Sequence, residues 1–499
     1  MKKLLLLLCL PLLSIAQVQI GQTIDGEAAD DFFGNNVAMS SDGTVVAISG
    51  VNNDGNGSES GHVRIYALQG DAWVQLGQDI DGEDEDDRSG SDISLSSDGT
   101  ILAIGASNND VTPNDGSSGR SGHARIYNYD GSTWVQLGQD INGEGILDRF
   151  GRSISISSDG TRVAIGAPSN DGSAQNTGQV RVFDFEGGTW VSEGQAIEGV
   201  AQNDDCGADV ELSADGNILA VGCPLFDVNG VSAAGQVRIY ENQNGTWVQL
   251  GNDILGEGTL DFMGDLGGIS LSSDGSIVAV SSANNDANGT NAGRVRVFNF
   301  DGNDWQQVGQ DLLGDEEGEE FGSRVDLSSD GSILAVSAIF NTFLGVGTGR
   351  VQVFQNVNNT WEPIGESIYG VAEDNINGSG ISLSDDASIL AVGALGNDNA
   401  NGASAGHTRI FDISNEILST EEVVSQHFQL LPNPAKEFVT IQSSRNNSIV
   451  DVSIYNTLGQ LVKNTTENQI DISSLESGIY IVKVATDIGR LESQKLIVN

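Results

Sequence analysis

Short apolar runs separated by turns rich in Gly, Asn and Asp fill residues 17–414 of the sequence. In one representative stretch the runs are 92–95, 101–106, 123–127 and 134–141, and a Ser-x-Asp-Gly turn joins the first two. Runs of this length that are bounded by turn residues predict β-strands. We therefore expect an all-β chain in which four antiparallel strands form each structural repeat.

The four-strand pattern recurs along the chain. Turns of the Ser-x-Asp-Gly type return every 56 to 61 residues, and all six tryptophans follow the same period. Four strands in a period of this length fit a blade of a β-propeller, because a coil of a β-helix would be much shorter. The markers are Asp42, Asp98, Asp159, Asp215, Asp274, Asp330 and Asp386 for the turns, and Trp73, Trp134, Trp190, Trp247, Trp305 and Trp361.

The seventh repeat ends near residue 414 and has no Trp strand. The missing strand has its counterpart at the other end of the repeats, because residues 18–27 match residues 74–83. A strand from the N-terminal end would complete the last sheet and leave no open sheet edge where the ring closes. Residues 17–414 are therefore predicted to form a seven-bladed β-propeller that is closed by an N-terminal strand.

Both ends of the sequence differ from the repeats. Residues 1–16 contain two lysines, an apolar run and a Ser-Ile-Ala end, which predicts a cleaved secretory signal peptide. The run is too short to span a bilayer and no other stretch is long enough, so we expect no transmembrane segment. Residues 415–428 are expected to be a linker, and the short strands of residues 429–499 predict a small β-sandwich.

The chain has 70 acidic and 22 basic side chains and a net charge of −48, and residues 17–414 contain no lysine. This charge argues against nucleic-acid binding, which depends on attraction to phosphates. In a blade, the loop before the first strand and the loop between the second and third strands emerge on one face. Both kinds of loop are acidic, for example 79–87 and 51–60. The face either attracts cations and basic partners or serves only solubility.

Two of these loops carry oxygen ligands at alternate positions, a spacing that suits calcium. The same loops contain Asn-Asp pairs, which can close a loop through Asx turns without a metal, so both readings stay open. The calcium candidates are Asp54, Asn56 and Ser58 in one loop and Asp286, Asn288 and Thr290 in the other.

Cys206 and Cys223 flank the hairpin turn of the fourth repeat, residues 213–216. If Leu212 lies opposite Asn217, the two cysteines face each other. An exported protein would then form a cross-strand disulfide; the alternative is two small core residues.

One repeat position holds His62, His123 and His407, but in other repeats it holds Gln or Arg. Such variation indicates a polar residue at the start of a strand rather than a catalytic group. No zinc spacing, nucleophile elbow, phosphate loop or dinucleotide fingerprint occurs. We therefore predict that the protein is not an enzyme.

Phe33-Gly34, Phe150-Gly151, Phe321-Gly322 and Gly166-Ala167-Pro168 resemble the FG-GAP repeats of integrin α-chain propellers and bacterial surface proteins. The resemblance implies a propeller that binds or adheres to an extracellular protein or glycan, with calcium as a possible cofactor in its Asp-rich loops. A polysaccharide-active enzyme and a purely structural surface protein remain alternatives. The Phe is replaced in four repeats, by Ser89, Cys206, Met263 and Asn377.

The last 70 residues resemble the C-terminal sorting domain of type IX secretion cargo. The resemblance rests on four segments, at 431–435, 458–460, 478–480 and 495–498. It implies a Bacteroidetes-type envelope, export to the periplasm, and passage across the outer membrane by the type IX machinery. In that family the cargo is then released or attached to the cell surface.

Overall fold

The computed structural model describes residues 17–110 and 119–414, and most of 428–498 outside five short gaps and the single residues 437, 466 and 474. The chain divides into two compact units, Met1–Ile417 and Leu418–Asn499. The predicted signal peptide and nearly all of the predicted linker lie outside the described residues. Every named element of the described part is a β-strand, so the predicted all-β fold is confirmed. None of the described segments is a helix long and apolar enough to cross a membrane.

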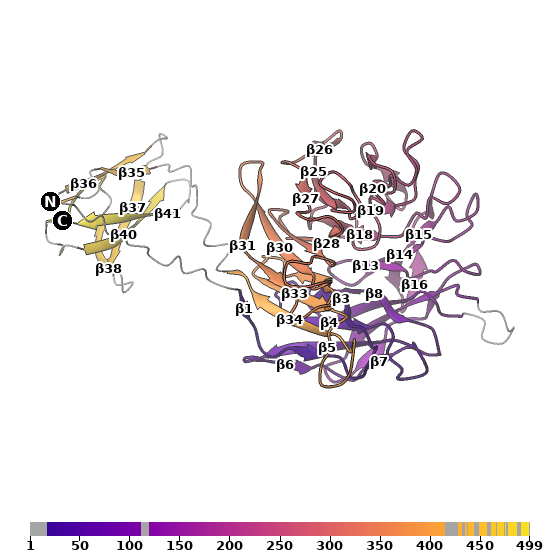
Figure 1. Cartoon of the computed structure of the whole chain (residues 1–499). Helices are drawn as coiled ribbons and strands as arrows, with labels where there is room; N and C mark the ends of the chain where they lie inside the picture. The colour runs from indigo at the N-terminus through magenta and orange to yellow at the C-terminus, as the bar shows by residue number, and fades with distance from the viewer. Residues whose placement is uncertain are drawn as a thin grey trace, which may run out of the picture. The chain divides into compact units, whose positions relative to one another are not determined.

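The first unit contains seven sheets, each with four main strands paired antiparallel in order from first to fourth (Figure 1). The first strands are β3 (Phe33–Met39), β8 (Ser89–Leu95), β13 (Ser153–Ile156), β18 (Val210–Leu212), β23 (Ile269–Leu271), β28 (Phe321–Leu327) and β32 (Asn377–Leu383). The second strands are β4 (Val45–Gly50), β9 (Ile101–Ala106), β14 (Arg162–Ala167), β19 (Ile218–Cys223), β24 (Ile277–Ser282), β29 (Ile333–Ala338) and β33 (Ile389–Ala394).

The third strands begin at the repeat position that holds His, Gln or Arg. They are β5 (His62–Gln69), β10 (His123–Tyr129), β15 (Gln179–Glu186), β20 (Gln236–Asn242), β25 (Arg294–Phe300), β30 (Arg350–Asn356) and β34 (His407–Asp412). The fourth strands are β6 (Ala72–Gln75), β11 (Trp134–Gln136), β16 (Thr189–Ser192), β21 (Trp247–Gln249), β26 (Trp305–Gln307), β31 (Trp361–Tyr369) and β1 (Val18–Gln19).

A short strand after each fourth strand pairs again with the third strand of the same sheet. In the sixth sheet β31 is long enough to include it. The short strands are β7 (Ile80–Asp81), β12 (Ile141–Asn142), β17 (Ile197–Glu198), β22 (Ile254–Leu255), β27 (Leu312–Leu313) and β2 (Ile24–Asp25).

The seven sheets form a closed ring. Each first strand contacts the first strand of the next sheet, from β3 to β8 and onward to β32, and β32 contacts β3. The first strands therefore surround the axis of the ring, and the fourth strands lie at its outer edge. Buried aliphatic and aromatic side chains fill the spaces between neighbouring sheets, as in the group that includes Ile126, Ile165 and Trp190.

The N-terminal strand closes the ring as predicted. Val18 pairs with Asp412 in β34, and Ile24 pairs with Thr408. The outer edge then repeats one contact between neighbours: the indole Nε1 of Trp134 donates to the carbonyl of Leu76 in the preceding sheet (2.8 Å). The N-terminal strand plays the same part, because its Ile20 carbonyl accepts from Trp73 (3.0 Å). The tryptophans of the fourth strands therefore join their own sheets to the preceding ones.

The Phe-Gly motif and the recurrent Arg of the third strand meet between sheets. The guanidinium of Arg64 lies 4.4 Å from the centre of the Phe33 ring and donates to the carbonyl of Asp25 in the last sheet (3.0 Å). A cation over an aromatic face is an attractive contact. Gly34 has φ of +91°, and a Cβ there would lie 2.5 Å from the carbonyl oxygen of His407, so only glycine fits.

The fourth repeat has the predicted disulfide, although the predicted hairpin register is wrong. Leu212 pairs with Leu219, not with Asn217. A bulge further along the hairpin brings the two cysteines back opposite each other. The carbonyl of Gly222 accepts from the Gly207 amide, while the Gly222 amide donates to the carbonyl of Asp209. Cys206 and Cys223 are bonded, with their Cα atoms 4.0 Å apart.

The second unit has two sheets, with strand orders β35-β36-β39 and β38-β37-β40-β41. Its core contains Val439, Ile454, Ile470, Val482 and Leu496, which are buried together. The strands are β35 (Phe428–Leu431), β36 (Phe438–Ser443), β37 (Ile449–Asn456), β38 (Leu461–Thr465), β39 (Gln469–Asp471), β40 (Gly478–Thr486) and β41 (Leu491–Val498).

Candidate functional site

A cavity of about 280 Å³ lies at the axis of the ring. Residues from the first strands of all seven sheets line it, because these strands surround the axis. Its charged lining residues are Asp92, Asp209, Glu211, Arg324, Asp326 and Asp385. The cavity is therefore polar and carries more carboxyl groups than cationic groups.

Burial changes the acidity of these carboxyl groups. It raises the pKa of Asp209 to about 8, with the nearby Asp92 as a further cause, and the pKa of Asp326 to about 7. The pKa of Asp92 is raised to about 6, and that of Glu211 is also raised, both mainly by burial. A buried carboxyl group resists ionisation because the charged form loses its hydration. At neutral pH the cavity thus holds protons that it can exchange.

The same carboxylates connect neighbouring first strands. Asp92 Oδ2 accepts from the amide of Ile154 in the next sheet (2.8 Å), and Asp209 Oδ2 accepts from the amide of Ile269 (2.9 Å). Two residues further along the first strand, a serine makes the same kind of contact: Ser94 Oγ accepts from the amide of Ile156 in the next sheet (3.0 Å). The axial carboxylates were not predicted from the sequence. Glu211 and Asp326 occupy a position that is Ser in four other repeats, but no such pattern marks Asp92 and Asp209.

The predicted calcium ligands lie in two separate loops, one in the first repeat and one in the fifth, where the structure shows them in other contacts. Asp54 Oδ1 accepts from the amide of Glu59 (2.9 Å), and the amide nitrogen of Asn56 donates to the carbonyl of Gly82 (2.8 Å). The carbonyl of Ser58 accepts from the amide of Asp86. In the fifth repeat, Asp286 accepts from the amide of Asn291, and the side chain of Asn288 donates to the carbonyl of Gly314. The carbonyl of Thr290 accepts from the amide of Gly318. These contacts hold each loop closed. Calcium binding there stays a prediction.

Buried acids at the entry to the first strands also shape this face. The Asp87 carboxylate accepts from the amides of Glu83 and Asp84 and from the side chain of Asn109 (3.1 Å). Asp148 and Asn170 repeat the arrangement in the next sheet (2.7 Å). Each buried acid therefore anchors two neighbouring acidic loops, which explains why the Asn-Asp pairs recur.

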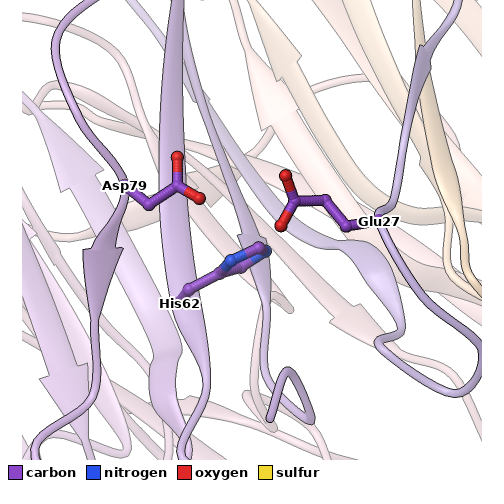
Figure 2. A group of neighbouring side chains, drawn as sticks. All are labelled: Glu27, His62 and Asp79. Atoms are coloured by element: carbon purple, nitrogen blue, oxygen red, sulfur yellow. The ribbon is translucent and has the colours of Figure 1, made fainter. Parts of the chain in front are cut away.

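A third cluster involves the histidines, which start β5, β10 and β34 as predicted. His62 lies with Glu27 and Asp79, and one ligand atom from each lies within 4.8 Å of the others (Figure 2). Glu83, His123 and Asp140 form an equivalent group. These groups were not predicted from the sequence, because the Glu of each group comes from the preceding sheet. The constant separation of 17 residues between His and Asp was the available signal.

Two family comparisons bear on the chain. The FG-GAP repeat family matches residues 146–183, which contain Phe150-Gly151 and Gly166-Ala167-Pro168. The secretion system C-terminal sorting domain family matches residues 429–499. Residues 429–499 are a type IX secretion sorting domain. The protein is therefore a type IX cargo that is exported and either released or held at the cell surface.

Solved structures similar to the chain include a protein from Bacteroides uniformis described as a 6-phosphogluconolactonase (14% identity, TM-score 0.45, covering 68% of this chain and 85% of that one). Others are the periplasmic gluconolactonase of Pseudomonas aeruginosa (17%, 0.44, 68% and 86%) and Raptor from Chaetomium thermophilum (11%, 0.47, 80% and 29%). No curated protein matches the sequence significantly.

Proposed function

We propose that the protein is an exported, non-enzymatic binding propeller whose acidic loop face adheres to a cationic extracellular protein or glycan. The observation that carries this proposal is the placement of the positive charges. Residues 17–414 contain 14 arginines and no lysine, and only Arg88 and Arg149 are exposed. The remaining arginines are partly or fully buried, so most of the exposed charged groups of the propeller are carboxylates.

The loop face is suited to such a partner because its acidic loops are held in place. Exposed Asp54, Asp84 and Glu85 stand on loops that the buried Asp87 and the Asn56 side chain tie together. A fixed array of like charges favours an oppositely charged partner at low salt and accelerates the encounter. A sorting domain that delivers the propeller to the outside of the cell fits a partner found there.

The test is binding of the purified protein to a basic polypeptide, poly-lysine, and to a glycan array, each at rising salt. We expect saturable binding that weakens from 50 to 500 mM salt because exposed charges are screened. Asp84→Asn with Glu85→Gln should weaken binding. The matched control is Glu186→Gln, an exposed acid in the turn between the third and fourth strands, on the opposite face. Equal loss in both variants, or no binding, would contradict the proposal.

The axial cavity supports a second candidate, a polysaccharide-active enzyme. Carboxyl groups with strongly raised pKa values in a cavity are typical of acid–base catalysis. Here, however, Asp92, Asp209 and Asp326 already bind the amides of neighbouring strands. Product release from an array glycan that is abolished by Asp209→Asn and Asp326→Asn would favour the enzyme. Binding without turnover would favour the adhesion proposal.

A further inference from the structure

Glu27, His62 and Asp79 form a compact group where the last sheet meets the first. His62 starts β5 and Asp79 lies just before β7 in the first sheet, whereas Glu27 follows β2 of the last sheet. Figure 2 shows the imidazole and the two carboxylates directed toward a common space. The Glu27 side chain is half exposed, which leaves this space open to solvent.

The imidazole of His62 has no hydrogen-bond partner among the described residues. The residue is 1% exposed, and neither ring nitrogen has a hydrogen bond. The Nε2–Cδ2 edge of the ring lies against Gly50, which leaves the opposite edge, with Nδ1, for other contacts. A neutral imidazole keeps a lone pair on one ring nitrogen, and this lone pair can bind a metal ion. A buried polar group without a partner is rare in folded proteins and calls for an explanation.

The fifth repeat shows what this position accommodates. Arg294 starts β25 at the register of His62, and its Nη1 lies 2.7 Å from Glu257 and 3.5 Å from Asp311. Glu257 and Asp311 correspond to Glu27 and Asp79. The fifth repeat therefore holds a positive charge between the same two carboxylates.

Two repeats with a single carboxylate at these positions hold a neutral amide. The third repeat has Glu144 but Ala196 in place of the second acid, and Gln179 stands between them. The fourth repeat has only Asp253, which accepts from Gln236 (2.7 Å). In these two repeats a neutral amide suffices beside one acid, whereas the sixth repeat holds Arg350 beside Asp315 and Ser367, and the seventh holds His407 with neither acid.

The second repeat has both acids and His123, but an arginine already neutralises them. Arg125 pairs with Glu83 and with Asp140 (3.2 Å). Among the described residues, Arg64 of the first repeat forms an ion pair with Glu27 alone (3.1 Å). Asp79 accepts only from the uncharged Gln75 side chain among the hydrogen bonds of the described residues. Among the described residues, no cation of the first repeat pairs with Asp79, whereas one arginine pairs with both acids in the second and fifth repeats.

We propose that Glu27, His62 and Asp79 bind a divalent transition-metal ion, with zinc as the representative, in the place that a guanidinium fills in the fifth repeat. An imidazole with two carboxylates is a ligand set that zinc accepts, with water in the remaining position. Calcium is disfavoured because it prefers oxygen ligands and a larger number of them. Zinc ligands stand about 3.4 Å apart, so rotation of the half-exposed Glu27 side chain completes the set.

The test is zinc titration of the purified, chelator-treated full chain by calorimetry, with millimolar calcium present to occupy sites made of carboxylates alone. Cobalt absorption in the visible range reports the ligand set independently. His62→Gln introduces the residue found naturally in the third and fourth repeats. The matched control is His407→Gln, because the seventh repeat has a buried His but Val371 and Thr23 in place of the two acids.

We expect one zinc site in the wild type, at least tenfold weaker zinc binding in His62→Gln, and unchanged binding in His407→Gln. Asp79→Asn, at a partly exposed residue, should weaken binding as well and provides a second test if His62→Gln unfolds. Unchanged zinc affinity and cobalt spectrum in both His62→Gln and Asp79→Asn would overturn the proposal. An equal loss in His407→Gln would also overturn it.

Discussion

At the outer edge of the ring, neighbouring sheets are joined by one contact made six times, whereas around the axis the contacts differ from sheet to sheet. Each outer contact is a Trp Nε1 donating to a carbonyl of the preceding sheet. At one axial position the successive residues are instead Ala38, Ser94, Ser155, Glu211, Ser270, Asp326 and Ser382. The Trp contacts are the same between sheets and hold the ring together. The axial position varies between repeats, and in two of them it holds an acidic residue. The predictions below test this division.

The largest effect should come from removing an outer contact. Trp190→Ala deletes a buried indole that packs against Ile126 and Ile165 and donates to Leu137 (2.8 Å). We expect the free energy of unfolding to fall by about 3–5 kcal/mol, as for other buried aromatic residues. Urea unfolding followed by Trp fluorescence and circular dichroism measures it. Val191→Ala, at an exposed neighbour, is the control, and an equal effect of the two would break the comparison.

A contact found in one sheet alone should matter less. Replacing both Cys206 and Cys223 with Ala removes the disulfide of the fourth repeat, which joins residues with a sequence separation of 17. The expected loss of unfolding free energy is about 2–4 kcal/mol, since the unfolded chain gains freedom. Thermal unfolding with and without reductant measures it. A reductant that lowers the midpoint of the double variant as much as that of the wild type would contradict the prediction.

The axial carboxyl groups should make stability depend on pH. Asp209 and Asp326 have folded pKa values of about 8 and 7, well above the unfolded value near 4, so the folded state binds more protons between these limits. Stability should therefore increase as the pH falls from 8 to 5, and this gain should be lost as the pH rises again.

The pH dependence is measured as the unfolding midpoint at several pH values. Asp209→Asn with Asp326→Asn should flatten the slope, whereas the exposed Glu186→Gln should leave it unchanged. A double variant with the wild-type slope would show that the axial groups are not the cause.

The smallest effect should come from the loop face. Asp54→Ala removes one acceptor for the amide of Glu59, and we expect a loss of about 0.5–1 kcal/mol at this exposed site. Thermal unfolding with and without calcium also tests the predicted metal. If calcium binds at Asp54, Asn56 and Ser58, it should raise the midpoint of the wild type more than that of the variant. An equal rise would contradict calcium binding there.

Regular features of the fold could be predicted from the sequence because they repeat. The spacing of Trp73 and Trp134 and the match between residues 18–27 and 74–83 sufficed to place the outer strands and the closing strand. The cysteine pair was predicted correctly through a wrong register, because the bulge at Gly207 cancels the two-residue error at Leu212. A bulge changes the register without leaving a mark in the hydrophobic pattern.

The candidate sites could be predicted only in part, because their residues come from different sheets. Glu27 and His62 meet only when the last sheet lies beside the first, and spacing within one repeat does not show that contact. Likewise, the axial Asp209 accepts from the amide of Ile269 only because the first strand of the next sheet lies beside it. Composition indicated an acidic surface, but the burial of most arginines between sheets became visible only in three dimensions.

The pairing of Val18 with Asp412 links the two ends of the propeller sequence. Until the chain has been made as far as Asp412, the first strand has no partner and the ring stays open. The sorting domain begins only at residue 429, so every chain that contains the sorting domain also contains β34, the partner of the first strand. A chain truncated before residue 407 would lack both the partner of the first strand and the sorting domain, so only chains that can close the ring carry the domain that directs export.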